Sequence, residues 1–222
     1  MYNRISIVGG SGSGKSTLAN ILSNELDIPA IHLDGLNFEA NWTEIDKNER
    51  DRIIVSKSDE QKWIIDGNYN KTLKERFNKA DLIIWLDYST LSQLKGLFKR
   101  FIKFHNSERP EIPGCKERLN FSFMKYVLTY NKKKRHIIID CLQDIPKEKI
   151  LIFKKQKDLN TWLKNFTHNE NILNFSKFKN INKIQKIRNK DDPLANLIAP
   201  HITIVFLFSD NVSIFKFYII FF

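Results

Sequence analysis

Cysteine is scarce in this chain of 222 residues, which contains only Cys115 and Cys141. Their separation matches no metal-ligand spacing, and two cysteines exclude a framework of several disulfides. We therefore expect two reduced thiols, as in a cytosolic protein. The chain also lacks the basic, apolar and small-residue pattern of a signal peptide at its start, which favours the same cytoplasmic location.

Long apolar runs are absent as well, because no uninterrupted stretch reaches the roughly 18 residues of a membrane-spanning helix. The most apolar part of the chain is 201–222, and Asp210 and Lys216 interrupt it. A membrane anchor is therefore not favoured, and we expect residues 168–222 to form a divergent C-terminal extension. A hydrophobic content of 42% indicates a globular protein, whose main domain is expected to cover residues 1–167.

Acidic residues are few in the middle of the chain. Residues 91–167 hold 18 Lys and Arg against 7 Asp and Glu, whereas residues 1–90 hold 11 against 14. Such a basic region attracts nucleic acid, a membrane surface or the phosphates of a small substrate, and it can equally be a solvated face. The run 132–135 is the best candidate for a nucleic-acid contact, although most four-residue charge runs are simply solvated.

Short apolar runs alternate with helical patterns along most of the chain. The runs are continuous, which is typical of parallel strands covered on both faces. This alternation predicts an open parallel sheet of about five strands between two layers of helices, a three-layer α/β/α fold. We expect strands at 5–8, 30–33, 63–65, 82–86 and 150–153. We expect helices at 16–26, 44–58, 72–77, 90–105, from about 121, and at 158–166, with 137–141 either helix or strand.

A glycine-rich segment follows the first expected strand. Residues 9–17 satisfy the pattern G-x-x-x-x-G-K-[ST], the P-loop (Walker A) motif. Its glycines let successive backbone N–H groups point at phosphate oxygens, and the positive N-terminal end of the next helix adds to the attraction. Lys15 is predicted to reach the β- and γ-phosphates of ATP, and the Ser16 hydroxyl to bind Mg²⁺. The predicted cofactor-binding residues are Gly9, Gly10, Ser11, Gly12, Ser13, Gly14, Lys15, Ser16 and Thr17.

Carboxylates follow three of the other expected strands. Asp34, Asp66 and Asp87 stand at strand ends, and open parallel sheets bind ligands beyond such ends. We predict that Asp34 accepts a proton from a substrate hydroxyl or holds Mg²⁺ through water, with a turn aspartate before Gly35 as the structural alternative. Asp66 is predicted to order Mg²⁺, with Asp87 as its rival. His32 is expected to point to the opposite side of its strand.

Further side chains are candidates for an acceptor site. Asn68 and Tyr69 are expected either to line the acceptor pocket or to pack the turn after Asp66. Guanidinium groups suit a transferring phosphoryl group, and we expect about two of four arginines to contact phosphate. These four are Arg76, Arg100, Arg109 and Arg118. The segment at about 100–120 is a candidate for a mobile lid, with Arg109 or Arg118 as the stabiliser of transferring charge.

Several segments resemble the small P-loop proteins called "DNA topology modulation protein", which look like relatives of adenylate kinases. The resemblance covers about residues 3–166 and implies an adenylate-kinase-like fold with a kinase-like ATP site. Adenylate kinases usually carry Pro-Arg shortly after their Asp-Gly pair, whereas Asn68 follows Gly67 here, so adenylate kinase activity itself is not implied. The matching segments are 9–17, Ile31-His-Leu-Asp34, Trp63-Ile-Ile-Asp-Gly-Asn-Tyr69, Asp81-Leu-Ile-Ile-Trp-Leu-Asp87 and Arg109-Pro-Glu-Ile-Pro-Gly-Cys-Lys-Glu-Arg118.

Two functions are consistent with these features. The first is an ATP- and Mg²⁺-dependent phosphotransferase whose acceptor is a nucleoside, a nucleotide or another small hydroxylated molecule. The second is a nucleotide-dependent DNA-binding regulator, in which the basic region 95–135 contacts phosphate backbones. The sequence contains no recognisable DNA-reading module, which favours the first. Neither the acceptor nor the oligomeric state can be derived from the sequence.

Overall fold

The computed structural model describes residues 2–105, 107–109, 111–117 and 121–173, without the side chains of Arg109 and 167–173. The chain divides into two units, Met1–Leu163 and Lys164–Phe222. Most of the second unit, and with it most of the predicted extension at 168–222, lies outside the described residues. The first unit contains the whole of the central sheet.

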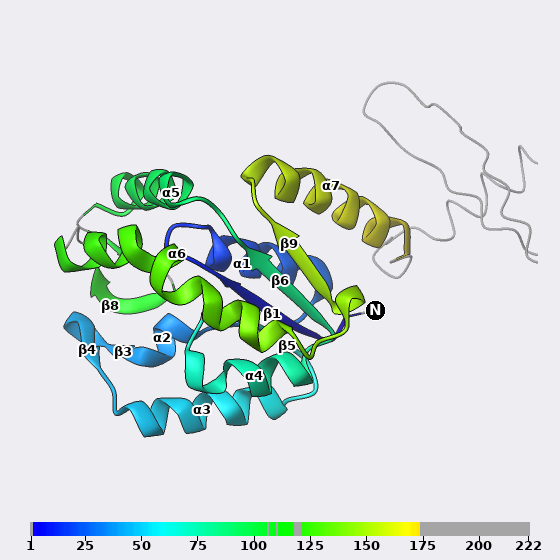
Figure 1. Cartoon of the computed structure of the whole chain (residues 1–222), viewed down its shortest axis with the longest axis horizontal. Coiled ribbons are helices and arrows are strands. Elements are labelled where there is room, and N and C mark those ends of the chain that lie inside the picture. Colours follow the sequence, from blue (N-terminus) through cyan, green and yellow to red (C-terminus); the bar gives the residue numbers. More distant parts are fainter. Residues whose placement is uncertain (1, 106, 110, 118–120, 174–222) are drawn as a thin grey trace, which may run out of the picture. The chain divides into compact units, whose positions relative to one another are not determined.

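Five parallel strands form the central sheet, in the order β2-β5-β1-β6-β9 (Figure 1). The predicted open parallel sheet of about five strands is thus confirmed. The crossovers that return the chain to either side of β1 bring the carboxyl ends of β2, β5 and β1 together. The strands are β1 (Arg4–Gly9), β2 (Ala30–His32), β5 (Trp63–Asp66), β6 (Leu82–Leu86) and β9 (Ile150–Phe153).

Helices cover both faces of the sheet and complete the three predicted layers. α1 (Lys15–Leu26) contacts β1 and β5 and lies behind the sheet in Figure 1, whereas α6 (Phe121–Leu142) crosses in front of it. No helix among the described residues is both long and apolar enough to span a membrane. The remaining long helices are α3 (Lys47–Asp59), α4 (Asn70–Lys79), α5 (Thr90–Lys103) and α7 (Gln156–Leu173).

The hydrophobic core explains the continuous apolar strands. β5 and β6 are buried along their whole lengths, because both of their faces meet helices. On one side, Trp63 and Ile65 of β5 belong to a cluster with Phe77 of α4 and Ile138 of α6. Ile138 and Leu142 occupy the buried side of α6 at helical spacing, so the strand alternative for 137–141 is wrong.

Local chemistry sets where some elements begin. The helix expected from residue 44 begins at Lys47, because the Asp46 side chain accepts hydrogen bonds from the backbone N–H groups of Asn48 and Glu49. β2 ends at His32, two residues before Asp34, which lies instead in the first turn of the short helix α2 (Leu33–Asn37). A five-residue helix has too few positions to show a hydrophobic period, so no sequence pattern predicts it.

The segments expected to be loops contain short elements of their own. After α2 come β3 (Phe38–Glu39), the 3₁₀ helix η1 (Ala40–Trp42) and β4 (Thr43–Glu44). The candidate lid contains an antiparallel hairpin of β7 (Glu108–Arg109) and β8 (Ile112–Lys116), which packs against η1. Two prolines near this hairpin favour a loop in the sequence, and strands of two to five residues carry too little pattern to oppose them. A second 3₁₀ turn, η2 (Lys147–Lys149), leads into β9.

Candidate functional site

The P-loop joins the end of β1 to the start of α1. Gly12 and Gly14 have φ of +79° and +88°, in the left-handed region that favours glycine. Gly14 caps α1, whose first turn contains no acidic residue of its own, and the positive end of the helix favours an anion. The Ser13 hydroxyl is buried and has no hydrogen-bond partner in the described part of the chain. A glycine cradle with an unpaired buried hydroxyl fits the phosphates of ATP.

α5 presses directly against this loop. A Cβ added at Gly96 would lie 1.9 Å from the Gly12 carbonyl oxygen, and one added at Gly12 would lie 2.2 Å from that of Gln93. Contacts this short mean that only glycines allow the two backbones to meet. Gly96 was not predicted as a site residue, because an isolated glycine within a helical pattern carries no motif.

The predicted magnesium ligands lie side by side. The Ser16 hydroxyl donates a hydrogen bond of 2.6 Å to Oδ2 of Asp66, which is only 4% exposed. This arrangement places a hydroxyl and a carboxylate at the phosphate end of the P-loop, as an Mg²⁺ site requires. The rival carboxylate is engaged elsewhere, because Asp87 accepts two hydrogen bonds of 2.8 Å from the Arg135 guanidinium.

His32 lies against the same carboxylate rather than pointing away from it. Its Nδ1 is 2.8 Å from Oδ1 of Asp66, and its Nε2 is 3.0 Å from the side-chain oxygen of Asn20. Burial lowers the pKa of His32, but the hydrogen bond and the negative charge of Asp66 outweigh it and raise the pKa above the ordinary value. The expectation that His32 lies on the far side is therefore wrong.

Two cavities open over the P-loop. The first, which we call the P-loop cavity, has a volume of about 440 Å³ and is lined by residues 11–17 together with α5 and α7. The second, the aromatic cavity, has a volume of about 610 Å³ and extends toward α2, α3 and α6. Four residues line both cavities and mark the junction between them: Ser11, Lys15, Asp34 and Arg100.

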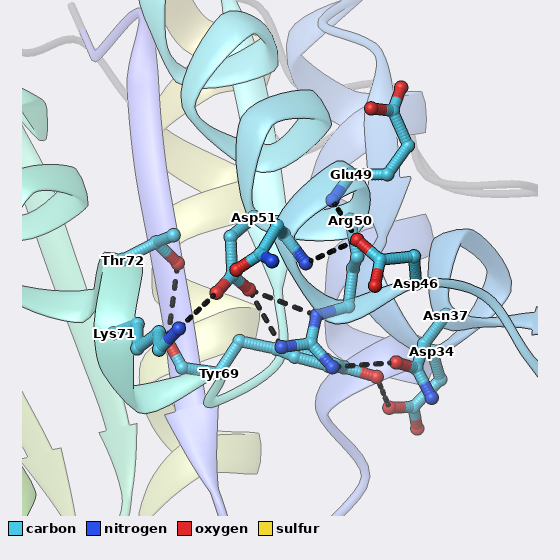
Figure 2. A network of polar contacts seen from close by, with 10 residues as sticks. Asp34, Asn37, Asp46, Glu49, Arg50, Asp51, Tyr69, Lys71 and Thr72 are labelled. Atoms are coloured by element: carbon cyan, nitrogen blue, oxygen red, sulfur yellow. Dashed lines mark hydrogen bonds and ion pairs between the residues drawn. The ribbon is translucent and has the colours of Figure 1, made fainter.

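Asp34 reaches this junction from α2 and is exposed. The Tyr69 hydroxyl donates a hydrogen bond of 3.2 Å to Oδ1 of Asp34, as Figure 2 shows. Burial and the negative charge of Asp34 both raise the pKa of Tyr69, so the phenol keeps its proton and remains a donor. The arrangement holds the Asp34 carboxylate in place while leaving it accessible to a ligand.

Arg50 supports Tyr69 from the other side. Its guanidinium lies 4.8 Å from the centre of the Tyr69 ring and donates hydrogen bonds to Asp51 and to the Asn37 side-chain oxygen (Figure 2). Arg50 lines the aromatic cavity, although no sequence motif marks it. Its position on α3, within a run of alternating charges, is indistinguishable in sequence from that of a solvated arginine.

Asn68 lines the aromatic cavity and also contacts the P-loop. Its side-chain oxygen accepts a hydrogen bond of 3.1 Å from the Gly9 N–H, and its amide nitrogen donates to the Gly9 carbonyl at 3.0 Å. The same nitrogen donates to the Tyr130 hydroxyl at 2.8 Å. Asn68 therefore couples the first residue of the P-loop to α6.

The two candidate arginines whose side chains the structure describes, Arg76 and Arg100, occupy different environments. Arg100 lines both cavities and forms an ion pair with Glu117 at 3.0 Å. Arg76 is fully buried and donates to Ser6 and to the Gly67 and Asn68 carbonyls, and it lines neither cavity.

The buried Arg76 consequently has a structural position and no access to a phosphate in either cavity. Burial lowers its pKa to about 10, although nearby Asp66 opposes the shift. Its three contacts instead fix the turn that carries Asn68 and Tyr69. Arg118 and the side chain of Arg109 lie outside the described residues, so their predicted roles stay untested.

Comparisons with known proteins assign no family to this chain. No family model matches the chain, and no curated protein matches it. The resemblance to the "DNA topology modulation protein" family therefore stays a prediction. Solved structures with similar folds include a shikimate kinase from Bacteroides thetaiotaomicron, which is 14% identical with a TM-score of 0.47, over 76% of this chain and 98% of that one.

Two other solved structures are similar to the same extent. A gluconokinase from Sinorhizobium meliloti 1021 is 14% identical with a TM-score of 0.43, over 78% of this chain and 97% of that one. A shikimate kinase from Acinetobacter baumannii in complex with shikimate is 14% identical with a TM-score of 0.45, over 73% and 94%. At these scores the likeness gives no information on the reaction, which has to be argued from the site.

Proposed function

We propose that the protein is an ATP-dependent phosphotransferase that acts on a small hydroxylated molecule. The observation that carries the proposal is the junction of the two cavities, where Lys15, Asp34 and Arg100 line both. A phosphoryl group that passes from one cavity to the other has to cross this point. It would meet a carboxylate that can take a proton and two cations that can stabilise its charge.

The P-loop cavity is the proposed donor site. Backbone N–H groups of residues 9–17 and the start of α1 would hold the phosphates of ATP, and the Lys15 ammonium would neutralise part of their charge. Mg²⁺, held by Ser16 and Asp66, would supply additional charge neutralisation on the phosphates. The two hydrogen bonds between the Asn68 side chain and the Gly9 backbone keep the first turn of the loop in place before ATP binds.

The aromatic cavity is the proposed acceptor site. An acceptor hydroxyl oxygen would form a bond to the γ-phosphorus of ATP, while the bond from that phosphorus to the β–γ bridging oxygen breaks and ADP leaves. One carboxylate oxygen of Asp34 would accept the hydroxyl proton. The Tyr69 hydroxyl would donate a hydrogen bond to the other oxygen of the same carboxylate. Lys15 and Arg100 would stabilise the charge on the transferring group. A contribution from Arg109 or Arg118 in a closing lid remains part of this proposal.

The described structure offers little to a nucleic-acid function. Within the basic run 132–135, Arg135 pairs with Asp87 and Lys134 lines the aromatic cavity. Only Lys132 and Lys133 of this run are fully at the surface, and two exposed lysines make a weak contact with a phosphate backbone.

The test is transfer of phosphate from ATP in the presence of a panel of small hydroxylated acceptors. One acceptor should stimulate ADP release, and Lys15→Ala should reduce the stimulated rate at least 100-fold, as expected for the loss of a cation at the transferring group. Lys95→Ala is the matched control, because Lys95 is an exposed lysine of α5 that lines neither cavity. Slow, acceptor-independent hydrolysis across the whole panel would contradict the proposal.

A further inference from the structure

Aromatic side chains gather on the acceptor side of the site. They come from three parts of the chain that are distant in sequence and lie around one cavity, and they contribute six of its lining residues: Phe38, Trp42, Tyr69, Phe123, Tyr126 and Tyr130. Such surfaces favour flat rings, because a planar base stacks on the face of an aromatic side chain.

One wall of the cavity comes from β3 and η1. The rings of Phe38 and Trp42 meet edge to face with centroids 5.2 Å apart. The Trp42 indole N–H donates to the Lys116 carbonyl at 2.9 Å, which ties this wall to the hairpin of β7 and β8. Trp42 and Tyr69 also have positive φ, of +64° and +31°, which is unusual for bulky residues. Backbone strain of this kind concentrates at ligand sites, where it holds side chains in place.

The other wall belongs to α6. The rings of Phe123 and Tyr126 are stacked with centroids 6.2 Å apart, and Tyr126 meets Tyr130 at 5.8 Å. Tyr126 keeps 40% of its surface exposed, so part of this residue stays accessible to a ligand. Aromatic walls from two separate elements are what a ligand with a planar ring needs.

Charges in the cavity argue for an uncharged ligand. Both arginines that line it are already paired: Arg50 with Asp51 at 2.7 Å and Arg100 with Glu117 at 3.0 Å. Away from the junction, a phosphate or carboxylate on the acceptor would have to compete with Asp51 for the Arg50 guanidinium, because Arg50 lines the aromatic cavity and not the P-loop cavity. Lys134 also lines the cavity and forms no ion pair within the described residues, so it would be the anchor if the acceptor were an anion.

Asn37 adds a polar group suited to a neutral ligand. This residue is only 4% exposed and lines the aromatic cavity. Arg50 holds its side-chain oxygen at 2.9 Å, which fixes the amide orientation and leaves the amide N–H groups for a ligand. An amide of this kind recognises the edge of a heteroaromatic ring or a sugar hydroxyl.

From these observations we propose that the acceptor is a nucleoside, with its base between the aromatic walls and a sugar hydroxyl at Asp34. This inference rests on the proposed phosphotransferase function and narrows it, since it disfavours nucleotides and polyhydroxylated acids. The hydroxyl oxygen forms the new bond to the γ-phosphorus, its proton passes to Asp34, and ADP leaves with the bridging oxygen.

A competition between three acceptor classes tests the inference. Purified protein with Mg²⁺ and γ-labelled ATP is offered ribo- and deoxyribonucleosides, their 5′-monophosphates, and the polyhydroxylated acids shikimate and gluconate. We expect at least one nucleoside to be phosphorylated with a kcat/KM at least tenfold above that of its monophosphate and of either acid. Preferred transfer to a monophosphate or to an acid would overturn the inference and leave the phosphotransferase function standing.

Binding supplies a second measurement that does not depend on turnover. Because Trp42 lines the cavity, a bound base should quench tryptophan fluorescence, and Trp42→Phe should remove that part of the signal. If no acceptor of any class is phosphorylated, the proposed function fails, and nucleoside binding still decides the nature of the cavity. Absence of nucleoside binding in this assay would overturn the inference by itself.

Variants on α6 link the acceptor to the aromatic wall. Tyr126→Leu keeps an apolar, helix-compatible side chain but removes the ring, and should raise the KM or Kd of the nucleoside about tenfold without changing the KM of ATP. Tyr126→Phe should restore wild-type values. Leu128→Ala is the control, because Leu128 is exposed on the same helix and does not line the cavity. Equal nucleoside affinity in Tyr126→Leu and wild type would overturn the stacking role.

Discussion

The P-loop cavity and the aromatic cavity differ in what their walls are made of. One wall of the P-loop cavity is backbone, made of a glycine loop and the first turn of α1 and supported by the close contact between Gly12 and Gly96, and side chains of α5 and α7 complete the cavity. The aromatic cavity presents side chains from β3, η1, α3, α6 and the turn after β5. A backbone wall binds a group that is the same in every nucleoside triphosphate, whereas a side-chain wall sets which second molecule enters.

Because of this difference, we expect substitutions in the two cavities to affect ligand binding in different ways. A Cβ at a glycine of the P-loop wall alters the shape of the whole cradle, because backbone atoms cannot move aside. A change of one aromatic ring removes one contact and leaves the others. Variants should therefore separate donor effects from acceptor effects, and the junction residues should be the exception.

The largest expected effect belongs to the junction. Asp34→Asn keeps the shape of the side chain and an oxygen that can accept the Tyr69 hydrogen bond, but it removes the proton acceptor. We expect kcat for phosphoryl transfer to fall about 10²- to 10⁴-fold, the range for loss of a general base, with the Kd of ATP changed less than threefold. Steady-state kinetics and fluorescent-nucleotide binding measure the two quantities. An unchanged kcat would show that Asp34 is a turn residue and not the base.

A smaller effect, confined to ATP binding, is expected from a change beside the P-loop cavity, the proposed donor site. Gly96→Ala adds a methyl group that would lie 1.9 Å from the Gly12 carbonyl oxygen, so α5 and the P-loop must separate. Overpacking of this kind costs about 1–3 kcal/mol of stability. Because ATP binding requires the undisturbed P-loop, restoring the close contact at this cost would raise the Kd of ATP about 5- to 150-fold. Calorimetric titration measures it, with Lys95→Ala as the control on the same helix.

Nucleoside binding to the same variant shows whether the effect is confined to ATP. Nucleoside binding to Gly96→Ala should stay within about threefold of wild type, because Gly96 lines only the P-loop cavity. Equal losses for ATP and nucleoside would mean that the two cavities behave as one structural unit.

The fold was predictable from the sequence where a buried element is long enough to give a clear pattern of apolar residues. β6 and β9 have the expected bounds, because strands packed between two helix layers read as uninterrupted apolar runs. α2 and the hairpin of β7 and β8 were not predicted, because elements of two to five residues are held by tertiary contacts and show no period of their own. The Cβ of Gly35, for example, would meet the Glu111 carbonyl at 2.4 Å, a contact no local pattern reveals.

The same distinction applies to the site. The donor residues were predictable because a P-loop is a contiguous backbone motif with a fixed spacing. Arg76 and Arg100 were indistinguishable in sequence, yet one is fully buried and the other lines both cavities. Arg50 belongs to the site only because α3 packs beside the turn that carries Tyr69. A site built from side chains of several elements depends on how those elements pack together. No short stretch of the sequence carries that information.

The smallest expected effect concerns His32, which lies against the donor wall and lines neither cavity. Asp66 raises its folded-state pKa above the ordinary 6.5, so protonated His32 stabilises the folded protein. This contribution is complete below pH 6.5 and is lost as the pH rises through the folded-state pKa.

Without nucleotide and Mg²⁺, His32→Asn should therefore lower the free energy of unfolding more at about pH 5.5 than at about pH 8.5. The difference between the two pH values should be below about 1 kcal/mol, as for ion pairs that keep some contact with solvent. Urea denaturation of wild type and variant at both pH values measures it. A larger loss at the higher pH would mean that neutral His32 is the stabilising form, with Asp66 accepting a hydrogen bond from an uncharged ring. In that case the donor wall would owe its shape to hydrogen-bond geometry and not to charge.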